Sequence, residues 1–106
     1  MISSFTYVSH QYKLVKDNHN YFVDILLFNI ELNCYIVVEL KLRSLKKEDK
    51  AQIKFYMRLV DEQVKESYHN KTIGIIISKE SDQLIVNFVR NDMIIPLDYK
   101  LIKSLL

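Results

Sequence analysis

The stretch Cys34-Tyr-Ile-Val-Val-Glu-Leu-Lys41 decides the fold, because five apolar residues lead directly into a carboxylate and an ammonium. An apolar run of this length, bounded by polar turn residues, is typical of a buried strand. Side chains alternate along a strand, so Glu39 and Lys41 are expected on the face that Tyr35 and Val37 share. Because burying either charge alone is costly, the stretch predicts that both charges have partners or a chemical task.

Two further apolar segments precede this strand, and short polar clusters separate them. The segments are Phe5–Val15 and Tyr21–Phe28, and the clusters are 16–20 and 29–33. Three strands joined by short polar loops predict an antiparallel meander. A second hairpin that turns between Glu31 and Leu32 would place Asp24 opposite Glu39. His10 and Gln11 then lie one strand from Asp24 and could line a cleft.

The residues after the meander have the spacing of a long helix. Apolar side chains recur at helical intervals between positions 48 and 66, namely Ile53, Tyr56, Met57, Val60 and Val64. Ser44 or Asp49 is expected to cap the start of this helix. The β-branched segment Ile73–Ile77 then predicts a return strand. The pattern predicts one α/β domain over residues 1–106, with a mixed central sheet, the meander, a long crossover helix and a further strand.

The C-terminal third allows two interpretations. Leu84–Val89 suits either a short helix or a strand, and its spacing slightly favours the helix. Met93–Leu97 predicts a last strand, and Pro96 favours an edge position for it. Leu101–Leu106 is expected to form a short apolar tail.

Composition narrows the class of protein. The 106 residues suit one domain, and 49% hydrophobic with 26% charged residues is the balance of a soluble globular protein. No apolar run approaches the ~20 residues of a membrane helix, and the first residues do not resemble a signal peptide. The absence of a long apolar run predicts no membrane partner. The single cysteine, Cys34, fits a reducing compartment, which predicts a cytoplasmic location.

A local basic patch follows the opening stretch, although the net charge of the chain is only +2. Seven of the fifteen basic residues lie between positions 41 and 58: Lys41, Arg43, Lys46, Lys47, Lys50, Lys54 and Arg58. A phosphate backbone favours such a patch, so the six residues after Lys41 are candidate nucleic-acid contacts. A solvated helix face explains the same charges and is the alternative.

Asp24 and Glu39 form a candidate metal site if the hairpin register holds. Two neighbouring carboxylates repel each other unless a cation joins them. Hard oxygen ligands on a rigid sheet suit Mg²⁺, which keeps several waters, and Lys41 could hold a water or stabilise a developing phosphorane charge. These residues predict metal-assisted phosphodiester hydrolysis, whereas an ion network that only fixes strand register explains them equally well.

Gln52 and Tyr56 lie one turn apart near the middle of the apolar helix face. A glutamine in a packed interface needs a hydrogen-bond partner. If the helix packs beside the strand of Glu39, both side chains approach the carboxylates. A partly exposed glutamine at the rim of the packed face is the alternative.

Asp24, Glu39-Leu40-Lys41 and Gln52-Ile-Lys-Phe-Tyr56 together resemble the PD-(D/E)XK nuclease superfamily, including its Gln-x-x-x-Tyr motif. Four segments are also similar, in order, to the C-terminal nuclease domain of YhcG-type nucleases: Tyr21-Phe-Val-Asp-Ile-Leu-Leu-Phe28, Val38-Glu-Leu-Lys41, Phe55-Tyr-Met-Arg-Leu-Val-Asp-Glu-Gln63 and Ile73-Gly-Ile-Ile-Ile77. The resemblance runs from Phe5 to Tyr99. Val23 departs from the proline that the superfamily name specifies.

The resemblance implies a sheet flanked by helices and Mg²⁺-dependent cleavage of nucleic acid, with DNA as the expected substrate and Mn²⁺ as a substitute metal. Asp24 and Glu39 match metal ligands, and the backbone carbonyl of Leu40 matches a third ligand. Lys41 matches the residue that orients the attacking water. Gln52 and Tyr56 match the accessory motif beside the site.

The resemblance also bears on partners. Longer relatives carry an N-terminal region ahead of the matching segments, so a partner that supplies such a DNA-binding region is one expectation. A homodimer is another, because a small nuclease that cuts both strands gains from two-fold symmetry. The alternative to catalysis is a silent nucleic-acid-binding or assembly module that keeps the nuclease fold.

Overall fold

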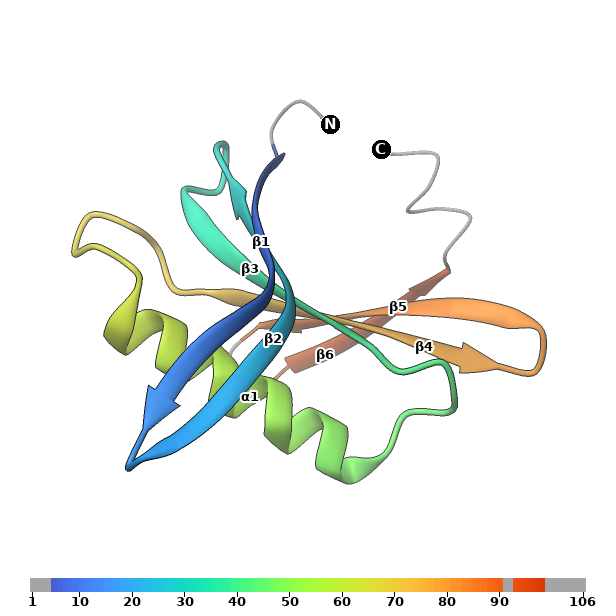
Figure 1. Cartoon of the computed structure of the whole chain (residues 1–106). Coiled ribbons are helices and arrows are strands. Elements are labelled where there is room, and N and C mark those ends of the chain that lie inside the picture. The colour runs from blue at the N-terminus through green and yellow to red at the C-terminus, as the bar shows by residue number, and fades with distance from the viewer. Residues whose placement is uncertain (1–4, 91–92, 99–106) are drawn as a thin grey trace.

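The computed structural model describes residues 5–90 and 93–98 of the chain. Six strands and one helix follow one another in the order β1-β2-β3-α1-β4-β5-β6 (Figure 1). Their bounds are β1 Phe5–Lys16, β2 His19–Asn29, β3 Cys34–Leu40, α1 Lys47–Gln63, β4 Ile73–Glu80, β5 Gln83–Arg90 and β6 Met93–Asp98. The predicted α/β class is confirmed. Within the described residues, no helix has the length and apolar character to cross a membrane.

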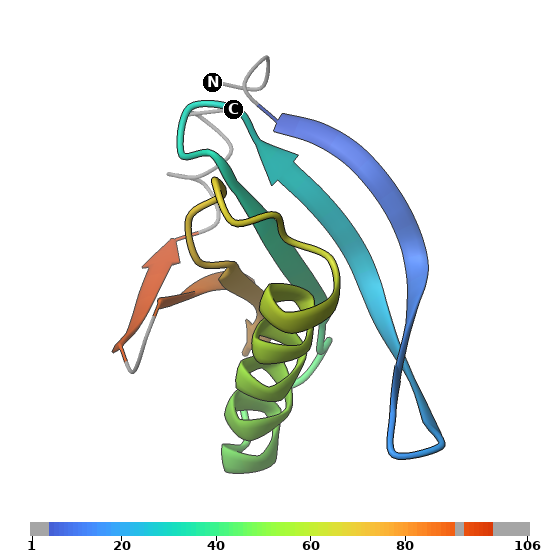
Figure 2. The same cartoon turned by 90° about the vertical axis from the view of Figure 1, so that its left-hand side faces the viewer.

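All six strands belong to one mixed sheet and lie in sequence order across it. Neighbouring strands are antiparallel except β3 and β4, which are parallel. A parallel pair needs a crossover connection, and α1 supplies it. Figure 2 shows α1 lying across one face of the sheet, between the β1–β2 hairpin and the later strands.

The β2–β3 hairpin has the register that its sequence predicts. Ile25 pairs with Val38 and Leu26 pairs with Val37 along this ladder. Continued by one residue, the same register sets Asp24 opposite Glu39. The backbone ladder ends before that pair, so side chains can take over the hydrogen bonding there.

The core lies between α1 and the sheet, and Gly74 allows the two to approach closely. Ile53 and Val60 of α1 are fully buried in the same cluster as Val37 of β3. A Cβ atom on Gly74 would lie only 2.8 Å from Met57 Sδ and 2.9 Å from Ile53 Cδ1. The close contact of α1 with β3 and β4 therefore depends on the absence of a side chain at this position.

The structure corrects the slight preference for a helix at Leu84–Val89, because these residues belong to strand β5. Their apolar spacing fits both periods, and pairing with β4 on one side and β6 on the other selects the strand. The buried Asn87 side chain adds to this pairing by donating to Ile76 O and Ser78 Oγ. Pro96 lies in the edge strand β6, as predicted. The expected tail at Leu101–Leu106 lies outside the described residues.

Candidate metal and nucleic-acid site

Asp24 and Glu39 hydrogen-bond across β2 and β3 where the backbone ladder ends. The amide of Asp24 donates to Glu39 Oε2 at 2.8 Å. The amide of Leu40 donates to Asp24 Oδ2, also at 2.8 Å. Each carboxylate therefore accepts a backbone N–H of the opposite strand, and the two side chains are held close together.

Glu39 is the unusual member of this pair, because only 3% of its surface is exposed. Burial raises its pKa from 4.5 to about 7. The hydrogen bond from the Asp24 amide opposes this rise, the negative charge of Asp24 adds to it, and the positive charge of Lys41 opposes it. The ionised form of Glu39 is thus poorly compensated by the protein, and a cation beside it would supply the missing charge.

The oxygen donors at this position suit Mg²⁺ chemically. An ionised carboxylate has about four lone-pair positions, so the single backbone bond recorded for Glu39 Oε2 leaves capacity for a metal ion. Mg²⁺ usually takes only one or two carboxylates and keeps several waters. Within residues 5–90 and 93–98 no group of three or more His, Cys, Asp or Glu side chains is gathered for a metal. A metal here would accordingly rest on Asp24 and Glu39, with the carbonyl of Leu40 as a predicted third ligand.

Lys41 follows β3 directly, and its backbone is fixed independently of its side chain. Its amide donates to Ile77 O of β4 at 2.7 Å. Among the described residues its ammonium makes no ion pair, although its charge acts on both Glu39 and Asp49. The structure thus places a partly exposed cation close enough to Glu39 to act on its charge.

Tyr56 of α1 lies within the electrostatic influence of the two acids, and Gln52 hydrogen-bonds to it. Gln52 Nε2 donates to the Tyr56 hydroxyl at 3.2 Å, so this glutamine has a partner within the packed face. Burial raises the pKa of Tyr56, and the negative charges of Glu39 and Asp24 raise it further. This electrostatic influence indicates that the phenol lies near both acids.

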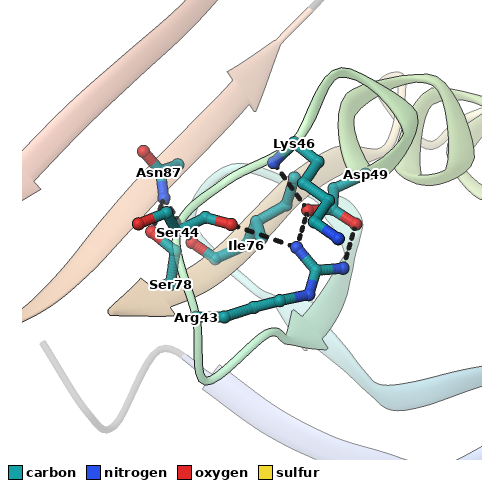
Figure 3. A network of polar contacts seen from close by, with 7 residues as sticks. All are labelled: Arg43, Ser44, Lys46, Asp49, Ile76, Ser78 and Asn87. Atoms are coloured by element: carbon teal, nitrogen blue, oxygen red, sulfur yellow. Dashed lines mark hydrogen bonds and ion pairs between the residues drawn. The ribbon is translucent and has the colours of Figure 1, made fainter. Parts of the chain in front are cut away.

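Arg43 connects the loop after β3 to the start of α1 (Figure 3). Its guanidinium donates to Asp49 Oδ2 at 2.8 Å and to Asp49 Oδ1 at 2.9 Å. Asp49 also accepts the amide of Lys46 at 2.8 Å, so Asp49 rather than Ser44 caps the helix, from its third residue. Hydrogen bonding to Arg43 is the main reason that the pKa of Asp49 falls to about 2. Arg43 is therefore engaged within the fold as well as being a candidate phosphate contact.

The other candidate nucleic-acid contacts lie at the start of α1 and along it. Lys46, Lys47, Lys50 and Arg58 are exposed and Lys54 is half-buried. From Lys47 onward these residues recur at helical spacing and so share one side of α1. The Arg58 guanidinium lies 5.5 Å from the centre of the Phe55 ring, which restricts its side chain. These cations form a basic strip along α1, on the other side of the helix from Gln52 and Tyr56.

Gln11 of β1 also contacts the site. Its Nε2 donates to Asp24 Oδ1 at 3.4 Å. In the sequence, only its position one strand from Asp24 indicated that Gln11 could contact the site. The same position applied equally to His10. The His10 ring instead contacts the Tyr7 hydroxyl.

Asp49→Ala is expected to lower the free energy of unfolding by about 2 kcal/mol, because it removes both carboxylate contacts of the Arg43 guanidinium and the acceptor of the Lys46 amide. Urea denaturation at pH 7 measures this loss. Glu48→Ala is the matched control, since Glu48 is an exposed acid in the same turn and should change stability by less than about 0.5 kcal/mol. Equal losses in the two variants would contradict a structural role for the Arg43–Asp49 pair.

Comparisons with known proteins identify a family. Searches of curated proteins and of solved structures give no significant match. A family model described as the YhcG PDDEXK nuclease domain matches residues 1–101, which is nearly the whole chain. The chain therefore belongs to the YhcG PDDEXK nuclease domain family.

Proposed function

We propose that the protein is a Mg²⁺-dependent nuclease that hydrolyses phosphodiester bonds, with DNA as the expected substrate. The hydrogen-bonded convergence of Asp24 and Glu39 beside Lys41 is the observation that carries the proposal. Membership of a nuclease domain family supports the class of reaction.

Asp24 and Glu39 would hold the metal ion, which supplies Lewis-acid activation of water and neutralises charge on the scissile phosphate. The Lys41 ammonium has three donors, with which it orients the attacking water and stabilises charge that develops on a phosphoryl oxygen. Burial and the two acids raise the pKa of Tyr56, so its phenol keeps its proton and would act as a hydrogen-bond donor. Gln52 fixes the direction of that phenol through its own hydrogen bond.

The basic strip on α1 would bind the sugar–phosphate backbone. Exposed lysines such as Lys47 and Lys50 neutralise phosphates without reading base edges, so this binding is expected to be salt-sensitive and sequence-independent. Arg43, held by Asp49, would offer a pre-oriented guanidinium at the end of the strip where α1 begins.

A catalytically silent nucleic-acid-binding module is the second candidate. It is favoured by the backbone hydrogen bonds that Asp24 and Glu39 already accept, because these bonds also serve to close the end of the β2–β3 ladder. It is further favoured by the small number of acids at the site within the described part of the chain.

Cleavage of supercoiled plasmid, labelled single-stranded DNA and labelled RNA tests the proposal directly. We expect product in Mg²⁺ or Mn²⁺, none in EDTA, and a loss of at least about 100-fold in rate for Asp24→Asn, which removes one charge of the metal site. Cleavage by Asp24→Asn at the wild-type rate would refute the assignment. Salt-sensitive DNA binding without a metal-dependent product would favour the silent module.

A further inference from the structure

Gln11 has a backbone conformation that is unusual for a residue inside a strand. Its φ is 48°, in the left-handed region. The other non-glycine residues with positive φ in the described chain lie in turns: Asp17, Asn18, Asn33 and Ser81. Left-handed backbone within an extended strand is unfavourable for a side chain such as glutamine, and such residues gather at functional sites.

This residue lies directly across from Asp24. His10 pairs with Ile25 and Tyr12 pairs with Val23, so the residue between them on β1 faces the residue between them on β2. The only side-chain hydrogen bond recorded for Gln11 within the described residues is the one to Asp24 Oδ1. The unusual backbone and the contact with the candidate metal ligand therefore occur at the same cross-strand position.

The alternation of side chains along β2 reverses near this position. The Tyr21 ring lies 5.0 Å from the Phe55 ring of α1, so Tyr21 faces the helix. Leu26 pairs with Val37, and both belong to the buried cluster that α1 covers. Regular alternation would put residues 21 and 26 on opposite faces of the sheet. The reversal lies between them, and Asp24 falls within that interval.

Irregularities of this kind commonly re-aim a side chain beside an active site. Here the reversal leaves Asp24 on the helix side of the sheet together with Glu39, and its carboxylate is held at both oxygens. The Leu40 amide donates to Oδ2 and Gln11 Nε2 donates to Oδ1. Neither contact neutralises the carboxylate, so the two donors fix its direction without removing its charge.

We propose that Gln11 is a positioning residue for Asp24. The left-handed backbone and the side-chain amide of Gln11 together aim the Asp24 carboxylate at a divalent cation. This inference rests on the proposed metal-dependent function. It assigns to β1 a part of the site that the motif residues of β2, β3 and α1 do not supply. Groups that orient a metal ligand typically change metal affinity when they are removed, without being ligands themselves.

The test uses the whole chain and two glycine variants that both tolerate positive φ. Gln11→Gly keeps the left-handed backbone accessible and removes the amide. Asn18→Gly makes the same change at a positive-φ residue of the β1–β2 turn, far along the strand from Asp24. Isothermal titration calorimetry with MgCl₂ and MnCl₂ measures metal affinity, and thermal unfolding in EDTA measures the metal-free fold.

We expect Gln11→Gly to weaken Mg²⁺ binding about tenfold while its melting temperature in EDTA stays at or above that of the wild type. Asn18→Gly should bind Mg²⁺ with wild-type affinity. Equal Mg²⁺ affinity in the wild type and Gln11→Gly would overturn the role of Gln11 alone. A wild type that binds neither metal would overturn the proposed function together with this inference. If Mg²⁺ binding is weakened equally in Gln11→Gly and Asn18→Gly, the role of Gln11 is also overturned.

Discussion

Lys41→Ala is expected to lower the rate of phosphodiester cleavage at least about 100-fold while Mg²⁺ affinity stays within a few-fold of the wild type. In the proposed mechanism the ammonium acts on the attacking water and on the charge of the transition state, and it is not a metal ligand. Its backbone is held by Ile77 and Arg43 rather than by the side chain, so the strand end keeps its position in the variant. The loss should therefore appear in the chemical step.

Single-turnover cleavage with saturating enzyme separates this step from substrate binding. Lys71→Ala is the matched control, because Lys71 is exposed and precedes β4, at the opposite end of the parallel β3–β4 pair from Lys41. Its rate should stay within about twofold of the wild type, as is usual for a surface substitution away from the site. If Lys41→Ala cleaves at the wild-type single-turnover rate, Lys41 has no part in the chemistry.

The sequence predicts the candidate site well where local pattern and strand register determine geometry. The polar cluster at 29–33 sets the β2–β3 hairpin, and the hairpin register then brings Asp24 to Glu39. Helical phase puts Tyr56 on the packed face, and the packing of α1 against β3 brings its phenol near the acids. Each of these steps depends on residues that are close in sequence or related by a simple turn.

Other features depend on contacts that the local pattern does not contain. The segment Leu84–Val89 became a strand because two neighbouring strands offered hydrogen bonds on both sides. The bidentate engagement of Arg43 requires the loop after β3 to fold back onto α1, and its charge alone indicated only a basic patch. The left-handed backbone of Gln11 is the least predictable feature, since glutamine has no preference for that conformation.

The metal-free protein is expected to lose about 3 kcal/mol of stability between pH 4.5 and pH 8.5 through Glu39 alone. The pKa of this carboxyl is 4.5 as an ordinary glutamate and about 7 in the fold. The folded state therefore binds the proton more tightly than the unfolded state over this range. The resulting stabilisation is fully present below about pH 4.5, declines as pH rises, and is lost above about pH 7.

Glu39→Gln isolates this contribution, because a glutamine oxygen can still accept the Asp24 amide and no longer ionises. In urea titrations in EDTA, the variant should match the wild type near pH 4.5 and exceed its stability by about 2–3 kcal/mol at pH 8.5. Glu80→Gln is the control at an exposed glutamate and should show no such divergence. A difference between Glu39→Gln and the wild type that does not change with pH would contradict the raised pKa.

Addition of Mg²⁺ decides whether the destabilisation by Glu39 serves a metal site. A buried, ionised carboxylate that only fixes strand register gains nothing from the ion, so the wild type at pH 8.5 would stay as unstable as in EDTA. A metal ligand recovers stability in proportion to the logarithm of the Mg²⁺ concentration above the dissociation constant. The recovery should be much smaller in Glu39→Gln, because that variant has lost both the charge that destabilised the fold and one of the two carboxylate ligands. The same pair of titrations thus separates a metal site from the ion network that explains the sequence equally well.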